Sequence, residues 1–101
     1  MAQTNVGTPY YMSPEQIHEV EYDEKTDIWS LGCVMYELVN LSPPFTATSH
    51  LGLAEKILAG KINRIPERYS EDLQNVIQWM LKVDAKERPT VEELIKIPKI
   101  N

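Results

Sequence analysis

The sequence predicts an all-α half-domain in which four helices pack round one central, buried helix at residues 25–39. Three observations lead to this prediction. Apolar residues recur at helical spacing in several segments, residues that cap helices stand at their starts, and no segment alternates convincingly between apolar and polar residues as a strand does. A chain of 101 residues, 43% hydrophobic and 25% charged, forms one core and leaves no room for a second domain.

The first helix is predicted at residues 14–19, after a polar loop at residues 1–12. Ser13 is placed to act as the N-cap, and Pro14 stands at the first helical position, where its missing N–H has no cost. Gln16 follows Ser13 at the spacing of a capping box, in which its side chain bonds back to the N-cap backbone. These residues predict where the helix begins.

The central helix at residues 25–39 follows cap candidates at residues 23–26 and has almost no polar side. A helix that is apolar on nearly all sides must be buried. Gly32 lies inside this helix and lowers its helix propensity by about 1 kcal/mol relative to alanine. Either a neighbouring backbone approaches Gly32 closely, or the glycine is simply tolerated. The apolar residues of the helix are Ile28, Trp29, Leu31, Cys33, Val34, Met35, Tyr36, Leu38 and Val39.

A neutral stretch separates the central helix from the third one. Residues 38–54 carry no Asp, Glu, Lys or Arg, and the Pro-Pro-Phe sequence at residues 43–45 predicts a packed loop. Apolar residues then keep helical spacing through residues 49–59. Gly60 is a natural residue to follow the end of that helix.

The last two helices are predicted at residues 71–82 and 91–97. Ser70 caps the first of them, which has the clearest amphipathic pattern in the chain. Thr90 and Glu93 form a second capping box at the start of the other. We read Trp29, Tyr36 and Trp79 as core residues and not as platforms for a ligand.

The composition argues against several function classes. A net charge of −5 would repel the phosphate backbone of a nucleic acid, so no nucleic-acid partner is predicted. No apolar run approaches the roughly 20 residues that cross a bilayer. The first ten residues lack the features of a signal peptide. We therefore predict no membrane partner and a cytoplasmic or nuclear location.

Metal and thiol chemistry are not predicted either. His18 and His50 stand far apart in the sequence, and neither has a ligand partner at metal-binding spacing. Cys33 is the single cysteine and lies in an apolar helix, where it is expected to be an inert core residue. The four glycines do not form a loop that could hold phosphates.

Three motifs, in order, carry the functional information. They are VGTPYYMSPE at residues 6–15, DIWSLG at residues 27–32 and RPT at residues 88–90. Together they resemble the lower lobe of a eukaryotic Ser/Thr protein kinase, from the end of the activation segment to the last helix. The wording VGTPYYMSPEQ and KTDIWSLGCVMYEL is most similar to the NIMA-related (never-in-mitosis) kinases, and the resemblance covers residues 4–98.

The resemblance implies structural roles for five residues. Glu15 would form a buried ion pair with Arg88 and tie the activation segment to the last helices, whereas the alternative is two solvated charges. Asp27 would accept backbone N–H bonds from a catalytic loop, although an acidic residue there also simply complements the helix dipole. Trp29 and Gly32 complete the structural set, in the central helix.

The resemblance also implies a substrate-binding loop at Thr8, Pro9, Tyr10 and Tyr11. Thr8 would contact the catalytic loop, and the next three residues would wall the pocket for the residue that follows the phosphoacceptor. Thr4 matches the position of the activation-loop phosphosite in these kinases. The alternatives are an ordinary turn threonine at Thr8 and an unmodified residue at Thr4.

The catalytic parts of a kinase are not found in these 101 residues. Phosphoryl transfer needs a glycine-rich loop, a strand Lys paired to a helix Glu, a catalytic-loop Asp and Asn, and a metal-binding Asp. We therefore expect residues 1–101 to be a partial kinase domain that lacks the N-lobe and the catalytic loop. It would have no catalytic residue, cofactor site or metal site of its own, and would be inactive alone. ATP and Mg²⁺ are implied for the full-length family.

The expected function is substrate docking and scaffolding within a Ser/Thr kinase, with protein substrates or regulators as partners. Two alternatives stay open at this point. The chain could be a non-catalytic interaction module or decoy, or a structural remnant with no retained role. For a kinase fragment, surface that the rest of a kinase would cover is expected to promote self-association, whereas a clean monomer would favour the interaction module.

Overall fold

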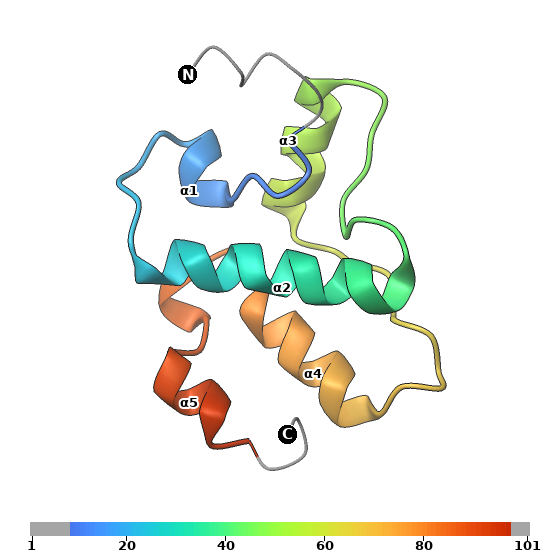
Figure 1. Ribbon diagram of the computed structural model, residues 1–101. Coiled ribbons are helices and arrows are strands. Elements are labelled where there is room, and N and C mark those ends of the chain that lie inside the picture. Colours follow the sequence, from blue (N-terminus) through green and yellow to red (C-terminus); the bar gives the residue numbers. More distant parts are fainter. Residues whose placement is uncertain (1–8, 98–101) are drawn as a thin grey trace.

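The computed structural model describes residues 9–97, which form five α-helices, one short 3₁₀ turn and no strand. The central helix α2 runs across the molecule, with α1 and α3 beyond one edge and α4 and α5 beyond the other (Figure 1). The prediction of an all-α fold with one central helix is confirmed. The elements are α1 (Pro14–Ile17), α2 (Glu24–Asn40), α3 (His50–Ala59), α4 (Glu71–Met80), η2 (Ala85–Glu87) and α5 (Val91–Ile95).

The helix starts follow the predicted caps. Ser13 and Thr90 each accept a hydrogen bond from the backbone of the third helical residue, whose side chain bonds back, so both capping boxes are confirmed. Ser70 caps α4, and Asp23, one of the cap candidates, begins α2. Each cap supplies an acceptor for backbone N–H groups that have no partner within the helix.

The helix ends differ more from the predictions. The first helix stops at Ile17, two residues early, because Glu19 has a left-handed backbone with φ of 59°. The fourth stops at Met80, because Leu81 leaves helical geometry with its side chain in the core. The fifth stops at Ile95. The third ends as predicted, with Gly60 in the left-handed conformation at φ of 74°.

The core is built round Trp29, whose ring stacks on Phe45 with ring centres 5.7 Å apart. Phe45 comes from the neutral stretch, so the prediction of a packed loop there is confirmed. Cys33 is fully buried, and burial raises the pKa of its thiol to about 12, which keeps it protonated as expected for a core cysteine. The main cluster contains Trp29, Cys33, Tyr36, Phe45, Leu53, Ile57, Ile65, Ile77 and Leu81.

Gly32 lies where the end of α4 meets α2. A Cβ atom on Gly32 would lie 3.0 Å from Cβ of Met80 and 3.0 Å from Cδ2 of Leu81. Of the two readings of this glycine, close approach is therefore correct. The approaching atoms belong to side chains, however, and not to the neighbouring backbone that the sequence analysis expected.

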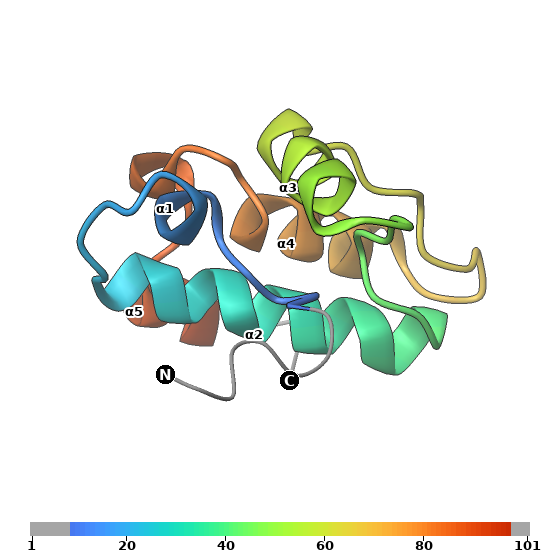
Figure 2. The same ribbon diagram turned by 90° about the horizontal axis from the view of Figure 1, so that it is seen from above.

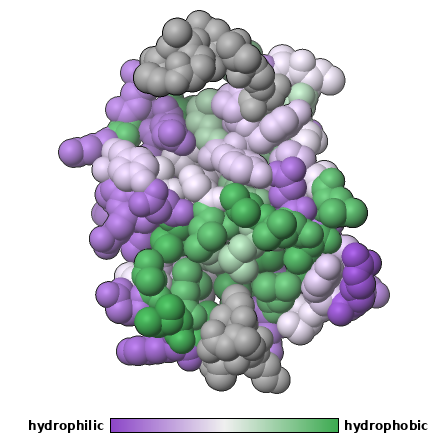
Figure 3. Space-filling view, in the orientation of Figure 1, coloured by the Kyte–Doolittle hydropathy of each residue, from purple (hydrophilic) through white to green (hydrophobic). Residues whose placement is uncertain are grey.

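One side of α2 is not buried. Leu31, Val34 and Leu38 are 47%, 37% and 71% exposed, and their spacing places them on one face of the helix. Figure 2 shows α3 and α4 together on the same side of α2, and Figure 3 shows hydrophobic surface across the middle of the molecule. The prediction that α2 is buried all round is therefore wrong for this face. We call these three residues the open face of α2.

Candidate functional site

The first part of the site is the ion pair between Glu15 of α1 and Arg88, which precedes α5. Nη2 of Arg88 lies 2.6 Å from Oε1 of Glu15, and Nη1 lies 2.8 Å from Oε2, so the contact is bidentate. The Arg88 side chain is fully buried and that of Glu15 is 12% exposed. The structure thus brings together the two charges that the sequence analysis paired.

Backbone carbonyls satisfy the rest of the Arg88 guanidinium. It donates to the carbonyl oxygens of Lys82, Lys25 and Val83 at 2.7, 2.8 and 3.2 Å. It also lies 5.0 Å from the centre of the Trp29 ring. A buried charge with this many partners fixes the relative positions of α1, α2 and the segment after α4.

Hydrogen bonds keep the Glu15 carboxyl ionised. Burial alone would raise its pKa, but the hydrogen bonds from Arg88 and from Thr26 outweigh burial, and the pKa is lowered. The Thr26 hydroxyl donates to Oε2 of Glu15 over 2.8 Å. Thr26 also belongs to the α2 capping box, so the start of α2 holds the carboxylate on its other side.

The second part of the site is a pocket of about 390 Å³ lined by Pro9, Tyr10, Tyr11 and Glu37. The Tyr11 hydroxyl donates a hydrogen bond to Oε1 of Glu37 in α2. This hydrogen bond, with partial burial and the negative charge of Glu37, raises the pKa of Tyr11 and keeps the phenol a donor. The structure therefore places three of the four residues of the predicted substrate loop round one hollow.

Sequence reasoning missed Glu37. It stands 26 residues from Tyr11, so no local pattern links the two. The sequence does hold one hint that Glu37 is unusual. It is the single charged residue between Asp27 and Glu55, in an otherwise neutral and mostly apolar stretch. Thr8, the fourth predicted loop residue, and Thr4, the phosphosite candidate, lie outside the described residues.

Asp27 and Trp29 occupy different surroundings. Asp27 is exposed in the first turn of α2 and accepts a hydrogen bond from the Tyr22 hydroxyl. Its contact with a catalytic loop stays a prediction. Trp29 is fully buried as predicted, and its Nε1 has no hydrogen-bond partner within the described part of the chain.

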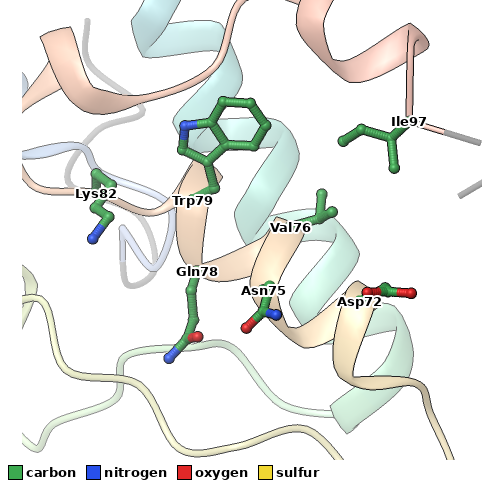
Figure 4. Close-up of a pocket in the computed structure, with 7 residues that line it drawn as sticks. All are labelled: Asp72, Asn75, Val76, Gln78, Trp79, Lys82 and Ile97. Atoms are coloured by element: carbon green, nitrogen blue, oxygen red, sulfur yellow. The ribbon is translucent and has the colours of Figure 1, made fainter. Parts of the chain in front are cut away.

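A larger hollow of about 670 Å³ lies along α4 (Figure 4). Trp79 is half-buried in its wall, and Val76 and Trp79 point to the side where Ile97 lies, whereas Gln78 points away. Trp79 is only half-buried and belongs to neither core cluster of the described residues, so the prediction that it is a core residue is wrong. Tyr36 does lie in the core, and its hydroxyl donates to the carbonyl of Asn63 over 2.9 Å.

Residues 9–97 contain neither a cluster of metal-ligating side chains nor a helix suited to cross a membrane. No group of three or more His, Cys, Asp or Glu side chains is placed there to hold a metal ion. No helix in the same range has the length and hydropathy that a membrane span requires.

Comparison with known proteins agrees with this geometry. The protein kinase domain family matches residues 1–100. The chain is 57% identical to the serine/threonine-protein kinase Nek2 of Homo sapiens over 99 residues, which cover 98% of this chain and 22% of the relative. It is 56% identical over 94 residues to a probable serine/threonine-protein kinase nek2 of Dictyostelium discoideum, covering 93% of this chain and 22% of the relative.

A third relative is the G2-specific protein kinase nimA of Emericella nidulans, 46% identical over 99 residues, which cover 98% of this chain and 14% of the relative. The chain thus spans about a fifth of the length of the two Nek2 relatives. It carries the paired Glu15 and Arg88, and a pocket lined by residues 9–11 of the VGTPYYMSPE segment. The chain belongs to the protein kinase domain family and, within it, to the NIMA-related serine/threonine kinases.

Proposed function

We propose that this chain supplies the substrate-docking and scaffold part of a Ser/Thr protein kinase. The whole reaction would transfer the γ-phosphate of ATP to a Ser or Thr hydroxyl of a protein. The pocket of Pro9, Tyr10, Tyr11 and Glu37 is the observation that carries this proposal. The loop that forms it leads directly into α1, which the Glu15–Arg88 pair ties to the rest of the fold.

In this proposal the chain is a partial kinase domain and does not catalyse the reaction alone. Its 101 residues contain no glycine-rich phosphate loop, catalytic-loop Asp and Asn, or metal-binding Asp of the kinase kind. ATP and Mg²⁺ would therefore be bound by other parts of a complete kinase. Its partners would be protein substrates or regulators in the cytoplasm or nucleus.

Nuclear magnetic resonance of the ¹⁵N-labelled chain tests this proposal. Adding a mixture of peptides with a central Ser or Thr should shift the signals of Tyr10, Tyr11 and Glu37. Tyr10→Ala should weaken the shifts, and Leu51→Ala, at an exposed site on α3, should not. Shifts confined to another surface would contradict substrate docking, and saturable Mg-ATP binding in calorimetry would contradict the non-catalytic role.

The open face of α2 favours a second candidate function, that of an interaction module. Leu31, Val34 and Leu38 gather exposed apolar side chains on one helix face, and contiguous apolar surface is typical of a site that binds a partner. Self-association of the chain through this face is part of this second proposal.

A further inference from the structure

Tyr22 is the most exposed tyrosine in the part of the chain that the structure describes. It is 59% exposed, whereas Tyr10 and Tyr11 are 38% and 37% exposed, Tyr69 is half-buried and Tyr36 is buried. The connection that carries Tyr22, between α1 and α2, bulges from the edge of the molecule in Figure 1. An enzyme that modifies a phenol can therefore reach this one.

The backbone beside Tyr22 is available to a second protein. Residues 20–23 belong to no helix or turn. The backbone N–H groups of Glu21 and Tyr22 make no hydrogen bond within residues 9–97. An extended segment with free backbone groups can pair with the peptide groove of an enzyme, and no helix has to unfold to present the tyrosine.

The sequence round Tyr22 is acidic on both sides. Acidic residues stand three and one positions before it and one and two positions after it, and all four are exposed. They are Glu19, Glu21, Asp23 and Glu24. Tyr10, by contrast, has no charged residue within four positions. This arrangement favours an enzyme whose peptide groove is basic, because opposite charges speed the encounter and fix the register.

The Tyr22 hydroxyl holds the connection against α2. It donates a hydrogen bond to Oδ1 of Asp27, in the first turn of that helix. A phosphate on the same oxygen would carry a charge of about −1.5 to −2 at pH 7 and would repel the Asp27 carboxylate. The adjacent cation is already engaged, because the ammonium group of Lys25 donates to the carbonyls of Ala85 and Arg88 over 3.4 and 2.8 Å.

We propose that Tyr22 is a phosphorylation site for a tyrosine kinase with a basic peptide groove, and that the phosphate releases the connection from Asp27. The Tyr22 oxygen attacks the γ-phosphorus of ATP bound to that enzyme, and the bond to the bridging oxygen of ADP breaks. The phenol proton passes to a base of the enzyme. This inference is independent of the proposed docking function, because the chain is here the substrate of another kinase.

The first experiment measures which tyrosine is modified. The full chain is treated with Mg-ATP and the catalytic domain of a tyrosine kinase that prefers acidic peptides, and mass spectrometry follows each tyrosine. Tyr22 should react about tenfold faster than Tyr10, as expected when charge steers the encounter.

Two double variants test whether the acidic neighbours cause this preference. Glu21→Gln with Glu24→Gln should remove most of the advantage of Tyr22. Glu55→Gln with Glu67→Gln removes the same charge from exposed sites elsewhere and should leave the advantage unchanged.

The second experiment tests the release from Asp27. Phosphotyrosine is placed at position 22 during synthesis of the ¹⁵N-labelled chain, and the heteronuclear NOE of residues 20–22 reports their motion on the picosecond to nanosecond timescale. The NOE should fall in the phosphorylated chain and in Tyr22→Phe, which lacks only the hydroxyl. Tyr11→Phe removes the phenol that binds Glu37 and should leave residues 20–22 unchanged.

Each experiment can overturn its part of the inference. If Tyr22 stays unmodified, or reacts no faster than Tyr10, it is not the phosphorylation site. If the NOE of residues 20–22 is the same with and without the phosphate, the phosphate does not release the connection. Neither result changes the expected binding of peptides at the pocket of Tyr10 and Tyr11.

Discussion

At the scale of single residues, the guanidinium of Arg88 has a partner for each of its nitrogens although it is fully buried. Arg88→Ala would leave the Glu15 carboxylate without its cation. We expect the free energy of unfolding to fall by about 3–5 kcal/mol, the range typical of breaking a buried pair. Urea denaturation followed by circular dichroism measures this change.

Arg64→Ala provides the matched control for Arg88→Ala. Arg64 pairs with Glu71 over 2.5 Å, but the two side chains are 38% and 71% exposed. Removing an exposed pair should lower the free energy of unfolding by less than about 1 kcal/mol. Equal losses in the two variants would show that burial does not set the strength of the Arg88 pair.

The Glu15 carboxyl gives the fold a defined dependence on pH. Its pKa is lowered in the folded chain, so its contribution to stability is complete above the ordinary value of 4.5 and is lost as the pH falls through the folded pKa. Glu15→Gln should therefore be less stable than the unmodified chain at pH 7. The difference in the free energy of unfolding between the two chains should decrease as the pH falls below 4.5. Urea denaturation of both chains between pH 7 and pH 3 measures this difference. A difference that stays constant with pH would contradict the prediction.

At the scale of elements, the contact between α2 and α4 depends on Gly32. Gly32→Ala would gain about 1 kcal/mol of helix propensity but place a Cβ against Met80 and Leu81, where overpacking costs about 1–3 kcal/mol. We expect a net loss of up to about 2 kcal/mol in the free energy of unfolding. Thermal denaturation of the variant measures it.

Leu81→Ala tests whether contact with the Leu81 side chain causes the loss of stability expected for Gly32→Ala. In the double variant the alanine at position 32 meets a shortened side chain, so the combined loss should be smaller than the sum of the two single losses by more than about 0.5 kcal/mol. Strict additivity would show that the contact with Leu81 is not what makes Gly32→Ala destabilising.

The helix starts could be predicted from the sequence because a cap acts within four residues. Ser13, Ser70 and Thr90 each bind a backbone N–H of the helix that they begin. The ends of α1 and α4 could not be predicted, because they follow from a left-handed Glu19 and from the packing of Leu81. Both depend on the rest of the fold, and neither leaves a local pattern.

The site could be predicted only in part for the same reason. The resemblance to kinases pairs Glu15 with Arg88 although they are 73 residues apart, because the family motifs carry long-range information. Glu37 falls within the KTDIWSLGCVMYEL stretch, but that stretch alone does not show that its side chain meets Tyr11, which depends on how α2 packs against the loop before α1. Trp79 has the spacing of a core residue, but its side chain lies in the wall of a hollow along α4 and stays half-buried.

At the scale of the whole molecule, the open face of α2 predicts association at high concentration. The double variant Leu31→Lys with Leu38→Lys places two charges one heptad apart on this face and should leave the chain monomeric. Leu51→Lys makes the same change at an exposed leucine of α3 and should not alter the association. Sedimentation velocity over a range of concentrations measures the association of the unmodified chain and of both variants. A clean monomer of the unmodified chain at high concentration would contradict the prediction.

The position of Trp29 makes the Arg88 pair visible to fluorescence. Its indole is fully buried beneath the guanidinium and against Phe45, whereas Trp79, the other tryptophan, borders a groove. The two indoles therefore differ in polarity of surroundings, and Trp79→Phe leaves an emission spectrum that belongs to Trp29 alone. Loss of the cation above that ring changes the spectrum without any change to the ring itself. The buried tryptophan is thus a built-in optical reporter of whether α1 is still tied to the last helices.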